Sequence, residues 1–323
     1  MTNNKKILIT GSSGYLGNFL AVYFGNKGVP VVGTDLKPHQ VIKDIPNFTF
    51  YSCDIRDREK LKEIFQKEKP THVIHLAYLM DPIHDKQAEY DIDVKGSKYA
   101  LEIANETESV KQFVLFSSAS IYGAHPDNPE YMYEDSLLRP ADYNYAKYKK
   151  EVEEYYHQFS KRNDMKLVIF RMCTAVGPSY YKSGGVVSSF SKAPFNLQIG
   201  FRKNAAQFIH EDDVKALVEK LINDESVEDT FNLGPDSYSF TGDLAEALGK
   251  KTYRIPYILL RIIFWFLWNL RIAAMTPAMA RLMAYPIAAH PKKLMEKYGY
   301  KFKYSTKEAF LDAVEKRKVN ETL

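Results

Sequence analysis

Short apolar runs rich in β-branched residues alternate with longer amphipathic stretches through the first half of the chain. The apolar runs predict buried strands at residues 6–10, 29–34, 48–52, 72–77, 113–117 and 167–171. The stretches between them have helical periodicity at residues 16–26, 57–66, 91–105 and 145–160. Strands that alternate with helices pair in parallel, because each helix returns the chain to the same edge. The pattern therefore predicts an α/β fold with a doubly wound parallel sheet.

The pattern changes after Gly177-Pro178, where the strand and helix signals become shorter. Residues 179–206 show little periodicity and are predicted to form a loop. Later elements are expected as a strand at 208–210, a helix from Asp212 or Asp213, and a strand at 231–233. We expect residues 1–175 to form one domain and residues 176–323 a smaller α/β region, with 208–234 as a candidate return to the first sheet.

The region from residue 255 to residue 289 is strongly apolar and raises the question of a membrane span. Arg261 and Arg271 interrupt it, and no window reaches the ~18–20 uninterrupted apolar residues that a spanning helix needs. We therefore expect no membrane span. A buried helix or a lid over an apolar pocket is the favoured interpretation, and a helix lying on a membrane surface is the alternative.

Composition excludes several classes of protein. Of the 323 residues, 45% are apolar and 26% are charged, which is typical of a globular chain and not of a disordered one. The two cysteines, Cys53 and Cys173, cannot form a disulfide framework, and no Cys/His cluster has the spacing of a metal site. These thiols, and an N-terminal apolar run too short for a signal peptide, lead us to expect a cytoplasmic protein without a bound metal.

The net charge of +4 comes from the end of the chain. Residues 290–323 hold nine Lys/Arg and five Asp/Glu, a surplus equal to that of the whole protein. A solvated helical face explains so small a surplus better than a nucleic-acid-binding patch, which would gather more positive charge on one surface. We expect no nucleic-acid partner.

A glycine-rich turn joins the first predicted strand to the first helix; residues 10–17 read TGSSGYLG. Gly11 permits a tight turn, and Gly14 lets backbone amides approach a pyrophosphate. Gly17 allows close packing of helix and strand, and the helix N-terminus favours an anion. Such a turn alone also occurs for purely structural reasons, but its place between strand and helix indicates a dinucleotide site.

Asp35 ends the second predicted strand, 24 residues after Gly11. A carboxylate there accepts both ribose hydroxyls of NAD and repels the 2′-phosphate of NADP. Lys37 is close, but no Arg follows directly. A turn-forming role before Pro38 is the alternative, and NAD is the favoured cofactor.

Further candidate residues follow the next three predicted strands, namely Asp54, Ile55, Leu76, Ala77 and Ser118. Ligands of open α/β sheets bind beyond the carboxyl ends of the strands. We therefore expect one crevice to collect these residues together with the glycine turn and Asp35.

Motifs in a characteristic order run through residues 5–235. They are GxxGxxG from Gly11, Asp35, CDIRD at 53–57, HLA at 75–77, SSASIYG at 117–123, Arg171 to Gly177-Pro178, FIHEDDV at 208–214 and FNLG at 231–234. Together they resemble the extended short-chain dehydrogenase/reductases, in their NAD-dependent epimerase/dehydratase branch. The resemblance implies a Rossmann-like fold, NAD as cofactor, a homodimer and a C-terminal substrate-binding region. It assigns cofactor binding to Gly11, Ser13, Gly14, Tyr15, Leu16, Asp35, Asp54, Ile55, Leu76, Ala77, Tyr145 and Lys149.

The family implies a catalytic Tyr-x-x-x-Lys pair, and this chain has three such pairs. They are Tyr23/Lys27, Tyr143/Lys147 and Tyr145/Lys149. The first follows the glycine turn, far from the expected chemistry. At ~100° per residue, Tyr145 and Lys149 fall on the apolar stripe of their helix, whereas Lys147 falls on its charged face. A catalytic lysine must face the cofactor, so Tyr145/Lys149 is the predicted pair and Tyr143 the alternative.

A free phenol has a pKa of ~10 and is a weak base at neutral pH. An ammonium one helical turn away favours the phenolate, so Lys149 would let Tyr145 act as general acid/base on a substrate hydroxyl. The resemblance further implies that Lys149 holds the nicotinamide ribose and that Ser118 hydrogen-bonds the substrate oxygen. Asp93 and Tyr78 depart from the family pattern, which often has Asn and a small residue at these positions.

Other departures bear on the substrate. Members that act on nucleotide sugars usually carry Asn and Arg where this chain has Thr174 and Ala206, so a substrate diphosphate would lose charge-assisted bonds. Arg202 or Lys203 is a candidate substitute. With the apolar region 255–289, these departures favour NAD-dependent hydride transfer at a secondary alcohol or ketone of a small, apolar substrate. A nucleotide-sugar epimerase or dehydratase is the alternative, and a non-catalytic NAD-binding regulator is the third.

Overall fold

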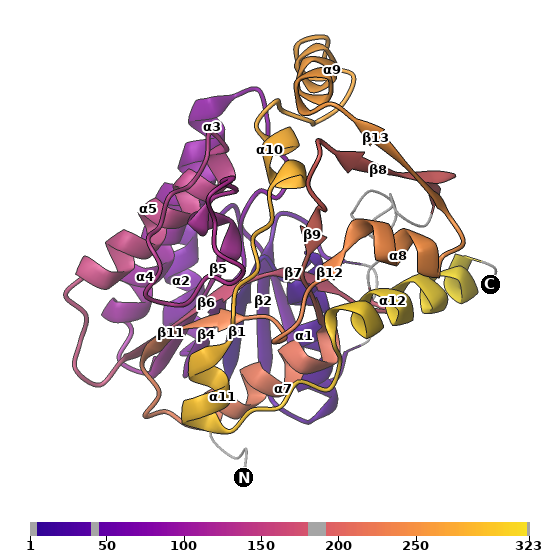
Figure 1. Ribbon diagram of the computed structural model, residues 1–323. Coiled ribbons are helices and arrows are strands. Elements are labelled where there is room, and N and C mark those ends of the chain that lie inside the picture. Colours follow the sequence, from indigo (N-terminus) through magenta and orange to yellow (C-terminus); the bar gives the residue numbers. More distant parts are fainter. Residues whose placement is uncertain (1–4, 40–44, 180–191, 322–323) are drawn as a thin grey trace. The chain divides into compact units, whose positions relative to one another are not determined.

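The computed structural model describes residues 5–39, 45–179 and 192–321 (Figure 1). The chain divides into two compact units and passes between them several times. The first unit consists of Met1–Ser117, Tyr148–Phe170 and Lys215–Thr230. The second consists of Ser118–Lys147, Arg171–Val214 and Phe231–Leu323.

A seven-stranded parallel sheet organises the first unit, in the order β11-β6-β5-β4-β1-β2-β3. Its strands are β1 (Ile7–Thr10), β2 (Val31–Asp35), β3 (Phe48–Ser52), β4 (His72–His75), β5 (Gln112–Ser118), β6 (Lys166–Met172) and β11 (Asp229–Leu233). Strands β1 and β4 are buried along their whole length, as expected for a sheet covered on both faces. The strand order reverses between β1 and β4, and α/β sheets bind ligands at such a point. The predicted α/β, Rossmann-like fold is confirmed.

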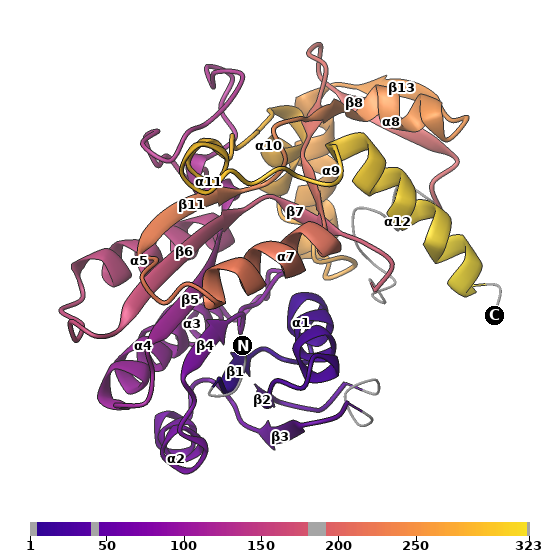
Figure 2. The same cartoon turned by 90° about the horizontal axis from the view of Figure 1, so that it is seen from below.

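Helices cover both faces of this sheet (Figure 2). They are α1 (Tyr15–Asn26), α2 (Arg58–Glu68), α3 (Lys86–Tyr90), α4 (Gly96–Glu106), α5 (Asn144–Gln158) and α7 (Glu211–Ile222). Helices α1 and α7 pack together, and the Tyr23 hydroxyl of α1 donates to Glu219 of α7 at 2.7 Å. On the other face, α2, α4 and α5 share one apolar core with the sheet, which includes Phe65, Leu101 and Val152.

Most predicted elements of this unit are present within one or two residues of their expected ends. The predicted helix 91–105 differs, because it begins as a π-helical turn at Asp91–Lys95 and continues as α4. In this turn the Gly96 N–H donates to the Asp91 carbonyl five residues back, and the Ser97 hydroxyl donates to the Asp93 carbonyl. Wide turns of this kind are frequent at functional sites.

Three two-stranded sheets are described in the second unit. Their parallel pairs are β7 (Thr174–Val176) with β10 (Phe208–His210) and β8 (Phe195–Ile199) with β13 (Lys251–Ile255), and their antiparallel pair is β9 (Ala205–Ala206) with β12 (Ser239–Phe240). The loop predicted over 179–206 is therefore wrong at β8 and β9, and residues 200–204 between them lie outside helices and strands as predicted. Its residues 180–191 lie outside the described ones. Strand β8 finds its partner far along the chain, and local periodicity does not show such a pairing.

Helices make up much of the rest of the described second unit. They are η3 (Ala119–Tyr122), α8 (Thr241–Ala247), α9 (Tyr257–Asn269), α10 (Met279–Ala284), α11 (Lys292–Tyr298) and α12 (Thr306–Glu321). The Phe208 ring of β10 stacks on Phe310 of α12 with centroids 5.3 Å apart. A separate core joins β8, α9 and α10 through residues such as Ile199 and Phe264. How cofactor and substrate binding divide between residues 1–175 and 176–323 stays a prediction.

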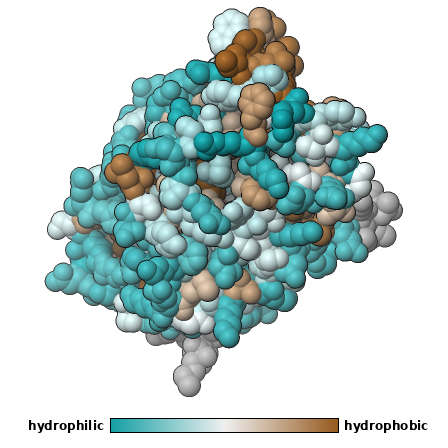
Figure 3. Space-filling model, in the orientation of Figure 1, coloured by the Kyte–Doolittle hydropathy of each residue, from teal (hydrophilic) through white to brown (hydrophobic). Residues whose placement is uncertain are grey.

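Helix α9 corrects the favoured interpretation of the apolar region 255–289. The favoured interpretation is a buried helix or a lid over an apolar pocket, but only Leu260 and Phe264 of this helix are buried, so the buried helix is wrong and the lid stays a prediction. The other apolar side chains reach the surface, where Figure 3 shows a hydrophobic projection over α9. Within the described ranges, no helix has both the length and the apolar character needed to cross a membrane.

Candidate active site

The glycine turn has the geometry that a dinucleotide site requires. Gly11 has a φ of +70°, and a Cβ there would lie 2.7 Å from the Ala77 nitrogen. A Cβ on Gly17 would collide with the Gly11 carbonyl oxygen. Helix α1 starts at Tyr15 with Gly14 as its N-cap, and no side chain caps it. A helix N-terminus without a side-chain cap is a position that favours an anion.

The Asp35 carboxylate lies beside this turn, at the end of β2. It accepts hydrogen bonds from the Ser13 N–H at 3.0 Å and from the Leu36 N–H at 2.7 Å. The Ser13 hydroxyl donates to the Lys37 carbonyl at 2.6 Å. The structure thus brings Ser13 and Asp35 together, as the cofactor prediction requires. Their contact with a nucleotide stays a prediction.

The other predicted cofactor residues, with the exception of Tyr145, also lie in the first unit. Asp54 pairs with Arg56 at 2.6 Å, and this hydrogen-bonded guanidinium lowers the pKa of the Asp54 carboxyl. Ile55 is buried, and its side chain fills the space where a Cβ on Gly96 would lie. At the start of α1, the Tyr15 ring packs edge-on against Phe19 with centroids 5.2 Å apart. Leu16, Leu76 and Ala77 are half-buried.

A buried hydrogen-bond network, which sequence reasoning missed, fixes the chain after β4. The Thr10 hydroxyl bonds His75 Nδ1 at 2.8 Å, and His75 Nε2 bonds the Ser97 hydroxyl at 2.9 Å. Because Ser97 gives its proton to the Asp93 carbonyl, we assign the proton of neutral His75 to Nε2. Burial, with a smaller effect of the Lys149 charge, lowers the pKa of His75 to about 3. The Thr10 oxygen accepts the Leu76 and Ala77 N–H groups, so the network orients the 76–77 segment.

Lys149 is buried at the carboxyl end of β5. Its ammonium donates to the Phe116 carbonyl at 2.7 Å and lies 3.6 Å from the centre of the Tyr78 ring. Burial lowers the pKa of Lys149, and the carboxylates of Asp93 and Glu153 act in the opposite direction. A buried ammonium held between a carbonyl, a ring and carboxylates has a fixed position.

Asp93 is the carboxylate that most supports this charge. Its Oδ1 accepts the Leu79 N–H at 2.8 Å, while Oδ2 has no partner among the described protein atoms. Burial raises the pKa of Asp93, and the Leu79 hydrogen bond and the Lys149 charge oppose that rise. The two departures from the family pattern, Tyr78 and Asp93, are therefore both neighbours of Lys149. No sequence pattern showed that they meet there.

The helix face predicted for α5 is confirmed. Lys149, Val152 and Tyr156 are buried, and Tyr145, one turn before Lys149, is half-buried. Lys147 is exposed and pairs with Asp142 at 3.2 Å, as the charged face predicts. The catalytic roles of Tyr145 and Lys149 stay predictions.

The two competing Tyr-x-x-x-Lys pairs have structural partners of their own. Tyr23 and Lys27 both bind Glu219, which ties α1 to α7. Burial is the main cause that raises the pKa of Tyr23, the opposite of what a catalytic phenol needs. Tyr143 is buried, and its ring lies 5.7 Å from that of Tyr145.

Ser118 and the substrate-side residues belong to the second unit. The Ser118 hydroxyl accepts the Ser120 N–H at 3.2 Å and so caps the short helix η3. Thr174 is exposed at the start of β7, and Ala206 lies half-buried in β9. Arg202, a candidate partner of a substrate phosphate, donates to the Pro126 carbonyl at 2.6 Å. Lys203, the other candidate, lies 5.0 Å from the Phe240 ring.

A second buried network, also missed from the sequence, organises this unit. The Arg171 guanidinium donates to the Tyr122 hydroxyl at 2.9 Å and to the Glu134 carbonyl at 2.7 Å. The Tyr122 hydroxyl donates to Asn232 Oδ1 at 2.6 Å. Each of these residues except Glu134 belongs to one of the motifs quoted above. Their role here is to hold the loop after Tyr122 in place.

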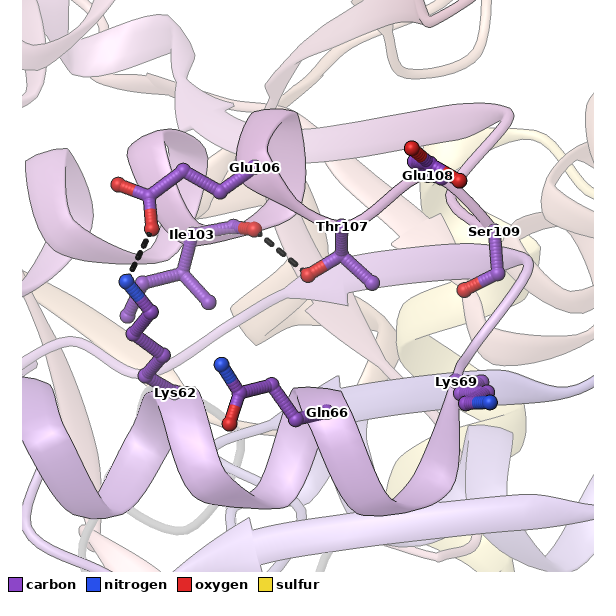
Figure 4. A pocket seen from close by; sticks show the side chains of 8 residues that line it. All are labelled: Lys62, Gln66, Lys69, Ile103, Glu106, Thr107, Glu108 and Ser109. Atoms are coloured by element: carbon purple, nitrogen blue, oxygen red, sulfur yellow. Dashed lines mark hydrogen bonds and ion pairs between the residues drawn. The ribbon is translucent and has the colours of Figure 1, made fainter.

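One groove of the first unit is not near this site. It has a volume of 620 Å³ and lies between α2 and the end of α4 (Figure 4). Lys62 pairs with Glu106 at 2.7 Å across it, and the Thr107 hydroxyl donates to the Ile103 carbonyl. Its lining residue Lys69 precedes β4, and Ser109 precedes β5, so the groove lies at the amino ends of the strands. Ligands of such sheets bind at the opposite edge. Over the described ranges, no cluster of His, Cys, Asp and Glu could hold a metal ion.

These features define a doubly wound α/β protein with a dinucleotide-type phosphate turn. The model of the NAD dependent epimerase/dehydratase family matches residues 7–234, and the chain belongs to this family of enzymes. The dTDP-D-glucose 4,6-dehydratase of Dictyostelium discoideum is 27% identical over 270 residues. That alignment covers 76% of this chain and 61% of the relative, so the chain spans less than two thirds of the relative's length.

Solved structures of similar fold bind nucleotides. The UDP-glucose 4-epimerase of Thermotoga maritima, solved with UDP-glucose, has a TM-score of 0.79 and 21% identity and covers 98% of this chain and 99% of its own. The Bordetella bronchiseptica enzyme WbmG, solved with NAD and UDP, has a TM-score of 0.78 and 19% identity and covers 97% of this chain and 94% of its own. At these identities the likeness shows the fold.

Proposed function

We propose that this protein uses NAD to transfer a hydride at a secondary alcohol carbon of a nucleotide-activated sugar, with Tyr145 as the general acid/base. The observation that carries the proposal is the buried Lys149, fixed on the Phe116 carbonyl one helical turn after Tyr145. The substrate class follows the names of the similar proteins, which are a dTDP-glucose dehydratase and a UDP-glucose epimerase. Nucleotide sugars therefore replace the small apolar substrate as the first candidate.

The residues of the glycine turn fit NAD. The close approach at Gly11 and Gly17 leaves room for backbone and not for side chains, and Asp35 offers a carboxylate to the ribose hydroxyls. Bound NAD supplies the acceptor and donor of the hydride. We assign its binding to Gly11, Ser13, Gly14, Tyr15, Leu16, Asp35, Asp54, Ile55, Leu76, Ala77, Tyr145 and Lys149.

Tyr145 does the proton chemistry in this proposal. The Lys149 ammonium favours the phenolate of a tyrosine one turn away, and Asp93 and Glu153 help to keep that ammonium charged. Tyr145 would take the proton of the substrate hydroxyl and return it later. Ser118 would hydrogen-bond the same oxygen and hold it in place.

A second candidate is oxidation of a neutral alcohol. Thr174 and Ala206 supply no charge for a substrate diphosphate, and this observation favours the neutral substrate. The exposed face of α9 weakens that case, because most of the apolar region lies on the surface. Arg202 and Lys203 are the cationic residues closest in sequence to Ala206, and they are the candidates to pair with a nucleotide phosphate.

The two candidates give different products. Purified protein with added NAD is incubated with UDP-glucose, dTDP-glucose or a hydroxysteroid; NADH is followed by absorbance and the products by NMR. We expect a changed sugar from one of the nucleotide sugars, with little net NADH, because the hydride is returned. Stoichiometric NADH from the hydroxysteroid alone would favour the second candidate. Tyr23→Phe is the matched control and should turn over normally.

A further inference from the structure

We propose that the exposed apolar surface of helix α9 and residues 270–275 docks on the surface of an anionic phospholipid bilayer. This surface belongs to the second unit and is independent of the proposed catalytic residues. Seven of its large apolar side chains are each 47% to 70% exposed, namely Ile258, Leu259, Ile262, Trp265, Phe266, Leu270 and Ile272. Figure 3 shows it as a hydrophobic projection from a mostly polar face. Soluble monomers rarely expose so contiguous an apolar patch.

The helix is apolar all round, but only one stripe of it is covered by protein. Leu260 and Phe264 pack with Ile199 of β8 and with α10. The stripe follows the helical repeat, so the remaining faces point away from this core. A helix with apolar residues on every side normally lies in a core or against lipid.

The charge around helix α9 favours an anionic partner. Between residues 247 and 295 the chain has eight Lys/Arg and no Asp/Glu. Arg254, Arg261 and Arg271 are exposed on or next to α9. A second copy of this chain would bring the same positive charge to the interface, whereas lipid phosphates bring the opposite charge. Both tryptophans of the chain, Trp265 and Trp268, also lie on α9, and tryptophan favours the membrane–water interface.

The helix is suited to lie on a bilayer rather than to cross it. Helix α9 has 13 residues, which is ~20 Å of α-helix against the ~30 Å of a bilayer core. The chain then turns at Arg271, which has a φ of +56°. Apolar side chains with an arginine on the helix, here Arg261, and with Arg254 and Arg271 next to it suit a helix at the membrane–water interface.

Tryptophan fluorescence tests this proposal directly, because both tryptophans report on α9. Full-length protein is mixed with vesicles of phosphatidylcholine and phosphatidylglycerol in a seven-to-three ratio, or with phosphatidylcholine vesicles. We expect a blue-shifted emission and co-sedimentation with the anionic vesicles. Binding to phosphatidylcholine should be at least ~10-fold weaker, and high salt should weaken the anionic binding. Unchanged emission with both vesicles would overturn the proposal.

Variants separate lipid binding from misfolding and from self-association. The double variant Ile258→Glu, Ile262→Glu should bind anionic vesicles at least ~10-fold more weakly while its far-UV spectrum and melting temperature stay near those of the parent. Leu137→Glu, at a side chain 73% exposed elsewhere, is the control and should bind as the parent does. Equal binding by the double variant would contradict the proposal. A dimer that forms in the absence of lipid would also contradict the proposal. Light scattering would detect this dimer, its formation would blue-shift the tryptophan emission, and the double variant would not form it.

Discussion

Helices α5 and α9 differ in how much of their apolar surface is buried. Helix α5 alternates charged and apolar positions, and its one apolar stripe faces the sheet with Lys149 buried in it. Helix α9 is apolar on all sides, yet only Leu260 and Phe264 are buried. The comparison teaches that a periodic pattern specifies which side of a helix is buried. A uniformly apolar helix has no such periodicity, so its sequence does not predict which of its sides is buried.

The lysines of α5 give the largest expected effect. Replacing Lys149 by Met should lower kcat about 10³-fold, ~4 kcal/mol, because the ammonium that favours the Tyr145 phenolate is lost. The matched change Lys147→Met removes an exposed lysine paired with Asp142 and should alter kcat less than about twofold. Steady-state kinetics on both variants measures this.

The stability of the Lys149→Met variant must be measured beside its kinetics. Lys149→Met leaves the buried Asp93 and Glu153 carboxylates without their cation, and removing one partner of a buried charged pair costs about 3–5 kcal/mol, so its melting temperature should fall and its kinetics are compared at a temperature where it is folded. Similar kinetic losses in the two lysine variants would mean that burial on α5 does not mark the catalytic lysine.

Two phenylalanines of α9 test its burial. Phe264 is 7% exposed and Phe266 is 52% exposed. Phe264→Ala should lower the free energy of unfolding by about 3 kcal/mol, whereas Phe266→Ala should change it by less than about 0.5 kcal/mol in the absence of lipid. Urea unfolding measures both. Equal losses would show that the outer face of α9 is also covered in solution.

Two neighbouring tyrosines provide the same test on α5. The Tyr156 hydroxyl is buried and donates to the Ser97 carbonyl at 2.7 Å. Tyr156→Phe should cost about 1–2 kcal/mol of unfolding free energy, because that carbonyl loses its buried partner. Tyr155 is half-buried, and its hydroxyl donates to Glu102. Tyr155→Phe should therefore lower the free energy of unfolding by less than about 1 kcal/mol. The reverse order of losses in urea unfolding would contradict the burial pattern of α5.

The smallest effect is a shift in pH dependence. The Asp93 carboxylate raises the pKa of Lys149 against the lowering caused by burial, and Glu153 acts in the same sense as Asp93. In Asp93→Asn the pKa of Lys149 should fall further, so the ammonium is lost at a lower pH. The alkaline limb of the kcat–pH profile should therefore move to lower pH. Asp91→Asn removes a half-buried carboxylate paired with Lys95 and should leave the profile in place. A shift to higher pH in Asp93→Asn would contradict the assignment.

Much of the first unit could be predicted from the sequence. Its strands and helices follow one another locally, so the periodicity of each segment is enough to place it. The pairing of β8 with β13 could not be predicted, because both strands are short and far apart in the chain. The exposure of α9 could not be predicted either, since its apolar residues show no preferred side.

The candidate site was only partly visible in the sequence. Spacing was enough to propose the glycine turn and Asp35, and helical phase separated Lys149 from Lys147. The contacts of His75 with Thr10 and Ser97 join three separate segments, so no local pattern reveals them. A histidine at the end of a buried strand was the one available signal.

Turnover by tyrosine variants tests the central claim most directly. NAD-loaded Tyr145→Phe and Tyr143→Phe are each given the substrate found with the parent, and product formation is followed together with NAD affinity. We expect Tyr145→Phe to lose at least ~10²-fold in rate with NAD affinity nearly unchanged, and Tyr143→Phe to keep most of its rate. Near-normal turnover by Tyr145→Phe, with the loss in Tyr143→Phe instead, would contradict the assignment of Tyr145 as the general acid/base.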